Sequence, residues 1–161
     1  MAPTVAELLQ GLENASLPAA IRESAWLYPA LEIVHIVGIV LLVGAAFLFD
    51  LRLLGLSPKI PVPDLADHVL PWSRRGLYLI IPSGILLFST NAVALAADPV
   101  FHLKLILLLV GILNAGLFHL FIFPSVSGWQ HKGIPQAAKA GATCSILVWL
   151  MVIACGRLLA Y

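Results

Sequence analysis

Long apolar stretches alternate with short polar connections along most of the chain. Four of these stretches exceed the roughly 20 predominantly apolar residues that an α-helix needs to cross a bilayer. They lie at about 26–55, 73–97, 100–123 and 137–160. The pattern predicts an all-α protein, an integral membrane four-helix bundle, in which residues 1–161 form a single domain.

Residues 1–23 precede the first apolar stretch and follow a different pattern. Thr4 and Glu7 have the spacing of a capping box at the start of a helix. We expect an amphipathic N-terminal segment that lies on the membrane surface, with these apolar residues on one face: Val5, Leu8, Leu9 and Leu12. The segment lacks the basic start and apolar core of a signal peptide, so the first apolar stretch is expected to act as the insertion signal.

Basic residues predict the orientation of the bundle. Six of the nine lie in or beside the first and third connections: Arg52, Lys59, Arg74, Arg75, Lys132 and Lys139. The other three lie toward the opposite side: Arg22, Lys104 and Arg157. Because basic residues gather on the cytoplasmic side of membrane proteins, we expect both termini to be extracytoplasmic.

Composition supports a membrane protein and excludes a nucleic-acid-binding one. Hydrophobic residues make up 61% of the chain and charged residues 11%, with a mean hydropathy of +1.01, far from the averages of soluble proteins. The principal partner is therefore the lipid bilayer. Nine basic and eight acidic residues leave no basic surplus for nucleic acid. Cys144 and Cys155 are about 16 Å apart along one helix and cannot pair, so we interpret them as packing residues.

Polar residues within the apolar stretches are the candidate functional residues. A charged side chain in a membrane helix costs at least ~2.5–3.5 kcal/mol on insertion scales, so a partner is expected for each. Glu32 and His35 lie one turn apart in the first stretch and are expected to face protein. In the third stretch, Lys104 shares a face with small residues, whereas His102 lies about 200° around the helix, at the rim. Asn114 flanks the Lys104 face.

Two ion pairs are expected from the levels of these residues in the bilayer. Glu32 and Lys104 both belong to the outer half and could neutralise one another. Asp50 and Arg75 both lie near the inner rim. The second and fourth stretches contribute small residues that favour close helix packing: Gly76, Ser83 and Thr90, then Gly141, Ser145 and Gly156. Such faces could also join two copies of the chain in a homodimer, an alternative that the sequence does not decide.

These residues admit three kinds of function. A haem needs an imidazole ligand, closely approaching helices and apolar surroundings. A Glu-x-x-His pair with a further donor could instead bind copper or zinc. The same groups could simply join helices, since polar contacts in membrane bundles contribute ~0.6–2 kcal/mol each. Spacing alone does not rank haem above a bare metal.

Three segments carry a resemblance to known families. They are the stretch around His35 and Gly44, the run from Trp72 to Pro82 that opens the second apolar stretch, and Phe101-His-Leu-Lys-Leu. In these segments the chain resembles a bacterial membrane family of unknown function. It is similar, more distantly, to the HemJ-type protoporphyrinogen oxidases and to the membrane domain of the copper-resistance protein CopD.

The resemblance implies a location, cofactors and roles. It implies the bacterial inner membrane, and for a HemJ-like protein it implies haem b with His35 as an axial ligand. Arg75 and Lys104 would then be the arginine and lysine that such proteins need for activity. A CopD-like protein would move copper. Thioether ligands suit Cu(I), but the chain has only two methionines, Met1 and Met151, and this scarcity counts against a copper function.

Our leading hypothesis is a haem b-binding membrane protein that transfers electrons or oxidises a quinol or porphyrinogen substrate. His35 is the expected ligand of the haem iron, with Lys104 or His102 as second ligand or propionate partner and Asn114 beside the cofactor. Glu32 would orient His35 or carry protons, and Arg75 would hold a propionate. The alternatives are a copper protein that uses Glu32, His35 and His102, and a non-catalytic membrane subunit.

Overall fold

The computed structural model describes residues 3–129 and 133–159, and this part of the chain contains helices and connections but no β-strand. Lys132, one of the six basic residues used for the orientation, lies outside the described residues. The elements in chain order are α1 (Val5–Glu13), α2 (Ser16–Glu23), α3 (Leu27–Leu53), α4 (Val62–Ser89), α5 (Ala92–Ala97), α6 (Pro99–Leu117), the π-helical turn η1 (Phe118–Ile122), the 3₁₀ segment η2 (Phe123–Gly128) and α8 (Gln136–Leu158).

Within the described residues, three helices are long and apolar enough to cross a membrane: Leu27–Leu53, Pro99–Gly128 and Gln136–Leu158. The all-helical fold is confirmed, and these three helices have the length and composition predicted for spans. The second predicted span, 73–97, differs from what the structure shows. Its residues are divided between α4, which begins eleven residues earlier at Val62, and the short α5, with a break at Thr90 and Asn91.

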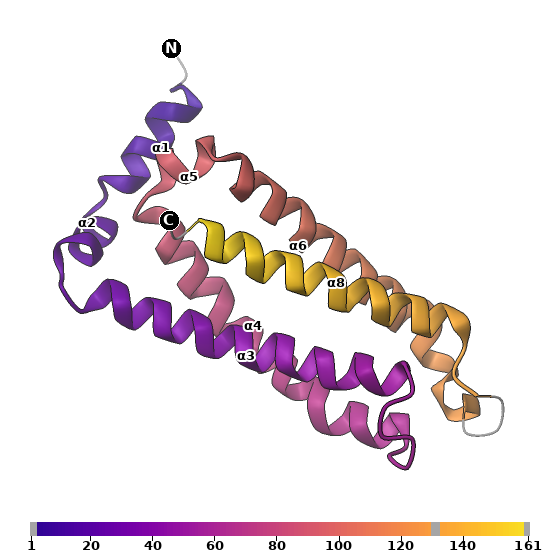
Figure 1. Ribbon diagram of the computed structural model, residues 1–161. Coiled ribbons are helices and arrows are strands. Elements are labelled where there is room, and N and C mark those ends of the chain that lie inside the picture. The colour runs from indigo at the N-terminus through magenta and orange to yellow at the C-terminus, as the bar shows by residue number, and fades with distance from the viewer. Residues whose placement is uncertain (1–2, 130–132, 160–161) are drawn as a thin grey trace.

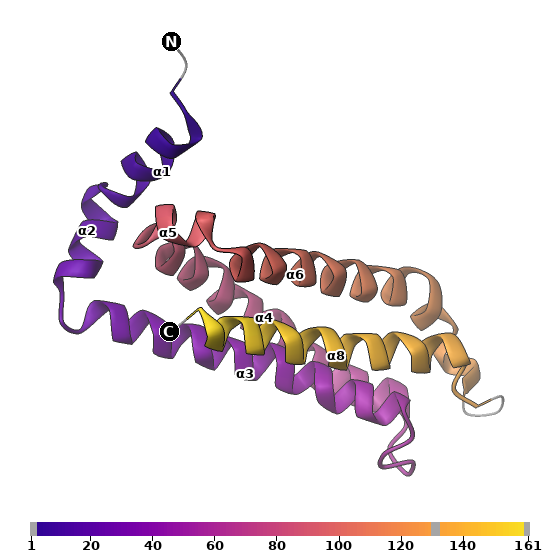
Figure 2. The same ribbon diagram turned by 45° about the horizontal axis from the view of Figure 1, so that its top comes forward.

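The four long helices run alternately in opposite directions, as Figures 1 and 2 show. α3 packs along α4, α6 packs along α8, and α8 also packs against α3, which joins the two pairs. The short α5 and both termini lie at one end of the bundle, here called the terminal end (Figure 1). The connection 54–61 and η2 lie at the other end, here called the loop end.

Glycine allows α3 and α4 to approach until their backbones touch. A Cβ added to Gly76 would lie 2.7 Å from the carbonyl oxygen of Gly38 and 2.7 Å from the backbone nitrogen of Leu42. Both glycines are buried. One turn along, the Ser73 hydroxyl donates a hydrogen bond to the carbonyl of Leu42, at 2.9 Å. Small residues and inter-helix hydrogen bonds of this kind are typical of helix packing in lipid.

The N-terminal segment forms the predicted helix and cap. The Thr4 hydroxyl accepts from the backbone N–H of Glu7, and the Glu7 carboxylate accepts from the N–H of Thr4 at 2.7 Å. The capping box is thus confirmed. These hydrogen bonds hold the pKa of the Glu7 carboxyl below its ordinary value.

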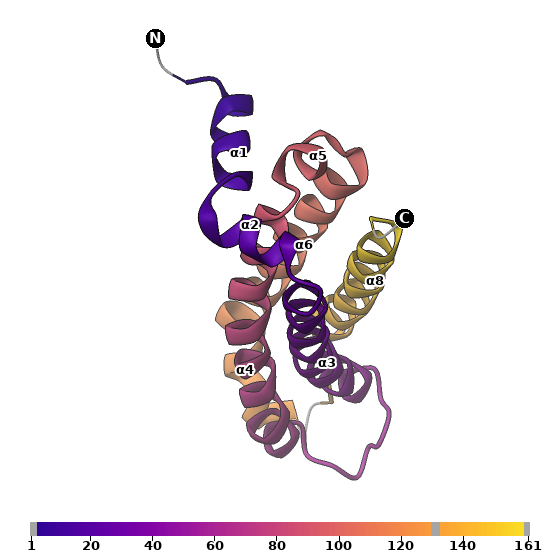
Figure 3. The ribbon, with the colours of Figure 1, turned by 90° about the vertical axis from the view of Figure 1, so that its left-hand side faces the viewer.

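α2 connects this segment to the terminal end of the bundle. The Arg22 guanidinium donates to the carbonyl of Glu13 at 2.6 Å and to the carbonyl of Thr90 at 3.1 Å. The Glu13 carboxylate accepts from the N–H of Val93 at 3.3 Å. α1 and α2 therefore lie beside the junction of α4 and α5, the arrangement visible in Figure 3.

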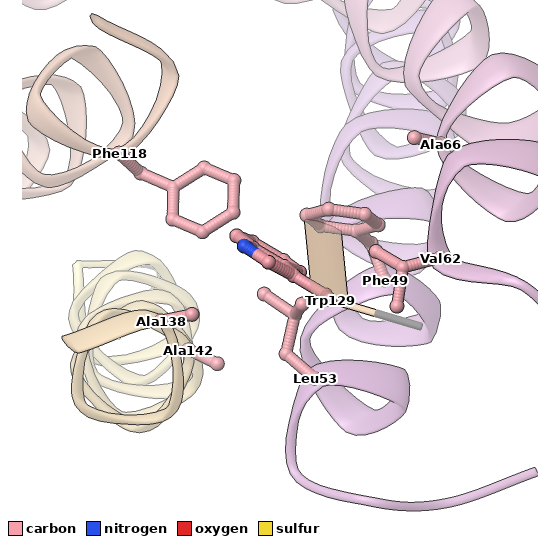
Figure 4. Close-up of a cluster of buried hydrophobic side chains, with 8 residues drawn as sticks. All are labelled: Phe49, Leu53, Val62, Ala66, Phe118, Trp129, Ala138 and Ala142. Atoms are coloured by element: carbon pink, nitrogen blue, oxygen red, sulfur yellow. The ribbon is translucent and has the colours of Figure 1, made fainter. Parts of the chain in front are cut away.

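A buried apolar cluster closes the loop end of the bundle. Figure 4 shows its eight side chains, which come from α3, α4, η1, α8 and the residue after η2: Phe49, Leu53, Val62, Ala66, Phe118, Trp129, Ala138 and Ala142. The rings of Phe49 and Phe118 meet edge to face with centroids 5.7 Å apart. Arg52 closes the neighbouring connection by donating to the carbonyls of Ile60 at 2.6 Å and Pro58 at 3.2 Å.

Candidate functional site

His35 is half-buried on α3, and its ring rests on α4. The ring nitrogen Nδ1 lies 2.9 Å from the hydroxyl oxygen of Ser83, which is 3% exposed. A Cβ added to Gly84 would come within 3.1 Å of His35 Cε1. The imidazole therefore sits against a residue that has no side chain, and a polar neighbour orients it.

The hydrogen bonds of Ser83 assign the tautomer of His35. A serine hydroxyl has one hydrogen, and Ser83 Oγ donates it to the carbonyl of Leu79 at 2.5 Å, with the carbonyl of Ile80 further away at 3.3 Å. Such a bond to the preceding turn is common for serine in membrane helices. The Ser83 oxygen must then accept from His35 Nδ1–H. In the neutral ring, Nε2 keeps a lone pair that can bind a metal or a proton.

Lys104 approaches the centre of the bundle from the other helix pair. Its side chain is half-buried on α6 and directed toward α8, where a Cβ added to Gly156 would lie 3.8 Å from the ammonium nitrogen. The contacts of the site join His35 of α3 to Ser83 and Gly84 of α4. Lys104 of α6 influences the imidazole only through its positive charge.

Glu32 does not join this site. It is exposed on α3 and forms no ion pair with Lys104. The expected Glu32–Lys104 salt bridge is therefore wrong. His102 is also exposed, on the other side of α6 from Lys104.

Arg75 lies away from both of its expected partners. It is exposed on α4, and its guanidinium lies 4.4 Å from the centre of the Trp72 ring in a cation–π contact. It makes no ion pair with Asp50, so that predicted pair is wrong. Arg75 precedes Gly84 by nine residues, or about 13 Å of helix rise, which separates it from the His35 ring.

Asn114 joins α6 to α8 at a point further along the bundle from His35 and Lys104. Its side-chain amide donates to the carbonyl of Gly141 on α8 at 3.1 Å. Asn114 follows Lys104 by ten residues, about 15 Å along α6. The structure therefore gives Asn114 a helix-joining contact and places it away from His35.

A metal site built from several protein donors is not present in 3–129 and 133–159. No three side chains of His, Cys, Asp or Glu come together there in a group able to hold a metal ion. The Glu32, His35 and His102 set expected for copper is not assembled, because two of its members face outward.

Sequence patterns identified Ser83 and Gly156 as small packing residues only, and Gly84 was not singled out. The available signal was the Pro82-Ser83-Gly84 run within a long apolar helix. A kink residue followed by two small residues marks a place where another side chain can approach a helix backbone. Which side chain occupies that place depends on the register of α3 against α4.

A family model described as "Family of unknown function (DUF6644)" matches residues 26–161. The match begins at the start of the first apolar helix and covers all four long helices of the bundle. No curated protein and no solved structure matches the chain.

Proposed function

We propose that this chain, which belongs to DUF6644, a family of unknown function, is a haem b-binding membrane protein that transfers electrons. His35 is the proposed axial ligand of the haem iron. The supporting observation is the hydrogen bond between His35 and Ser83. Imidazoles that bind metals generally donate their other N–H to a fixed acceptor, which sets the tautomer and the ring orientation. His35 has this arrangement, with Nδ1–H held and Nε2 left to bind.

The other residues of the site fit the same cofactor. The missing side chain at Gly84 lets the imidazole rest on the backbone of α4, and the surrounding helices are apolar. Lys104 supplies a positive charge, either to pair with a haem propionate or to act as a second ligand. Lys104 is preferred over His102 for this role because Lys104 faces the bundle and His102 is exposed.

Haem supplies one-electron chemistry, and the protein residues hold and tune it. Ser83 would keep His35 in its ligating tautomer. A quinol or a porphyrinogen is the proposed type of reductant. The copper alternative receives less support, since one imidazole suffices for haem whereas copper needs several converging donors.

We also propose that α4 crosses the membrane together with α3, α6 and α8. α3 and α6 run in the same direction along the bundle (Figures 1 and 2), so the chain must return between them, and α4 lies along α3. The basic residues beside the connections then favour extracytoplasmic termini in a bacterial inner membrane.

The test is the visible spectrum of the full-length protein, purified in detergent from cells supplied with haem precursor. A Soret band, with α and β bands that sharpen on dithionite reduction and a pyridine haemochrome of the b type, is the expected result. A colourless, folded protein would overturn the proposal, and elemental analysis would then show whether it carries copper or zinc.

Substitution of the ligand makes the test specific. His35→Gly should lose the Soret band, and added imidazole should restore it by occupying the space of the missing ring. His102→Gly is the matched control, because His102 is exposed, and it should keep the spectrum. If His35→Gly retains the full Soret band with unchanged positions, His35 is not the ligand.

A further inference from the structure

Asp50 is a buried carboxyl group that the proposed haem site does not use. It lies in α3, three residues before the helix ends at Leu53, and is 6% exposed. Its side-chain hydrogen-bond partner is the Ser145 hydroxyl of α8. The second carboxyl oxygen, Oδ2, is buried and has no hydrogen-bond partner within the described part of the chain.

Within residues 3–129 and 133–159, no basic side chain forms an ion pair with this carboxyl. Arg52, two residues along the same helix, gives its hydrogens to the carbonyls of the connection 54–61, and Arg75 of α4 stacks on a tryptophan. On α8, the Ser145 hydroxyl is its partner. His119 of η1 is the titratable side chain on the adjoining aromatic residues, since its ring contacts Phe118 and Phe118 packs on Phe49. Asp50 thus faces one hydroxyl group and apolar side chains.

An ionised carboxylate is unfavourable in such a place. A carboxylate that is buried without a countercharge generally takes up a proton and becomes neutral instead of staying charged. Carboxyl groups kept inside membrane bundles are characteristic of proton and ion paths. The unsatisfied Oδ2 of Asp50 is an atom to which a proton or a water molecule can bind.

We propose that Asp50 is a proton-binding site, occupied as the neutral acid in the closed bundle and loaded from the loop end. Asp50 is about 5 Å of helix rise from the end of α3 at Leu53, but about 35 Å from its start at Leu27. Loading transfers one proton from hydronium to the carboxylate and leaves a water molecule, and release reverses the step. This proposal is independent of haem binding.

The apolar cluster of Figure 4 separates the site from water at the loop end. Phe49 and Leu53, the neighbours of Asp50 on α3, belong to that cluster, as does Trp129. Protons therefore reach Asp50 only when this cluster opens enough to admit water. We therefore expect the proton of Asp50 to exchange with water, but slowly, because the apolar cluster shields the carboxyl group.

Dicyclohexylcarbodiimide tests the proposal, because this apolar reagent modifies carboxyl groups that are protonated in an apolar environment. We expect mass spectrometry of the labelled wild-type protein in lipid nanodiscs at neutral pH to locate the adduct at Asp50. The rate should fall about tenfold per pH unit once the acid titrates. Asp64 and Asp67, which are exposed on α4, are internal controls and should stay unlabelled, and Asp50→Asn should remove the adduct.

Two outcomes would overturn the proposal. One is an unlabelled Asp50 in the folded protein when the unfolded protein at acid pH is labelled. The other is protection of Asp50 by sodium at constant pH, which would identify a sodium site instead of a proton site.

Infrared spectroscopy of the wild-type protein gives a second readout that does not depend on the folding of a variant. A protonated carboxyl band should be present at neutral pH and should shift in D₂O as its proton exchanges. Absence of the band, or a band that never shifts, would contradict a loaded and exchangeable site.

Discussion

Gly38 of α3 and Gly76 of α4 lie back to back, so closely that a methyl group on Gly76 would come within 2.7 Å of the Gly38 carbonyl oxygen. The two helices that carry His35 and Ser83 are therefore positioned by a backbone contact three residues from His35. The distance between these helices determines the hydrogen bond of the candidate site.

We expect Gly76→Ala to lower the stability of the bundle by ~1–3 kcal/mol, the usual cost of overpacking. The added methyl group meets two backbone atoms of α3 and cannot be accommodated by a side-chain movement. Thermal unfolding in detergent, followed by circular dichroism, measures the effect. Gly44→Ala on α3 is the matched control, since nothing lies within 4 Å of its added Cβ, and its greater helix propensity should make it neutral or stabilising by ~0.5–1 kcal/mol.

Ser83→Ala should weaken haem binding about 10–100-fold if His35 is the iron ligand, because the imidazole loses the acceptor of its Nδ1–H. Haem titration of the apoprotein gives the affinity. Ser89→Ala is a suitable control, since Ser89 is equally buried on α4 and donates only to the carbonyl of Leu86 in its own helix. Equal losses in the two variants would show that the effect is not specific to His35.

Gly84→Ala should move the His35 ring without removing any hydrogen-bonding group. The new methyl group would lie 3.1 Å from His35 Cε1 and 3.6 Å from Nδ1, so the ring must shift by a few tenths of an ångström. The expected result is a displaced Soret maximum and reduction potential in a folded protein. An unchanged spectrum in a haem-loaded variant would contradict the placement of the ring against Gly84.

Asn114→Leu should destabilise the contact between α6 and α8 by ~0.6–2 kcal/mol, as Gly141 loses its hydrogen-bond donor. Thr143→Val is the control, because the exposed Thr143 hydroxyl donates within α8 to the carbonyl of Lys139. The free energy of unfolding of both variants can be measured in mixed detergent micelles with an increasing mole fraction of SDS. The haem spectrum should be the same in both, since Asn114 lies about 15 Å along α6 from Lys104.

The cap of α1 should be pH-dependent. The capping hydrogen bonds lower the folded-state pKa of Glu7, so its carboxylate stabilises the start of α1. This stabilisation is fully present above the ordinary pKa of a glutamate, about 4.3, and is lost as the pH falls through the folded-state pKa. Carboxyl ¹³C NMR should find the Glu7 midpoint below that ordinary value, and Thr4→Ala should return it there. A midpoint unaffected by Thr4→Ala would contradict the capping box.

Hydrophobic patterns were sufficient to predict the all-helical fold and three helices long and apolar enough to span a membrane. The spacing of Thr4 and Glu7 was sufficient to predict the cap of α1. These properties depend on neighbouring residues in one segment. The patterns also suggested that Lys104 faces the bundle and His102 the outside, which follows from the 200° between them on one helix. The pairing of His35 with Ser83 was not predictable. It depends on how α3 slides along α4, and this is set by the contact between Gly38 and Gly76.

The two incorrect ion pairs have similar causes. Gly76 and Ser73 both face α3, so Arg75, about 100° from Gly76 around α4, is turned away from Asp50. Glu32 shares a helical stripe with His35, but the stripe does not show where the neighbouring helices cover it. Rotation and tilt of whole helices decide these contacts, and the sequence of one helix does not contain them.

The apolar cluster at the loop end also has a consequence for biogenesis. Phe49 and Leu53 are synthesised early, in α3, whereas Ala138 and Ala142, which cover them, belong to α8 and emerge from the ribosome much later. Until α8 inserts, this end of the bundle stays open to lipid and Asp50 lacks its Ser145 neighbour. A nascent chain that ends before Gln136 should therefore be recognised as incomplete by membrane proteases, because its loop end and Asp50 stay uncovered.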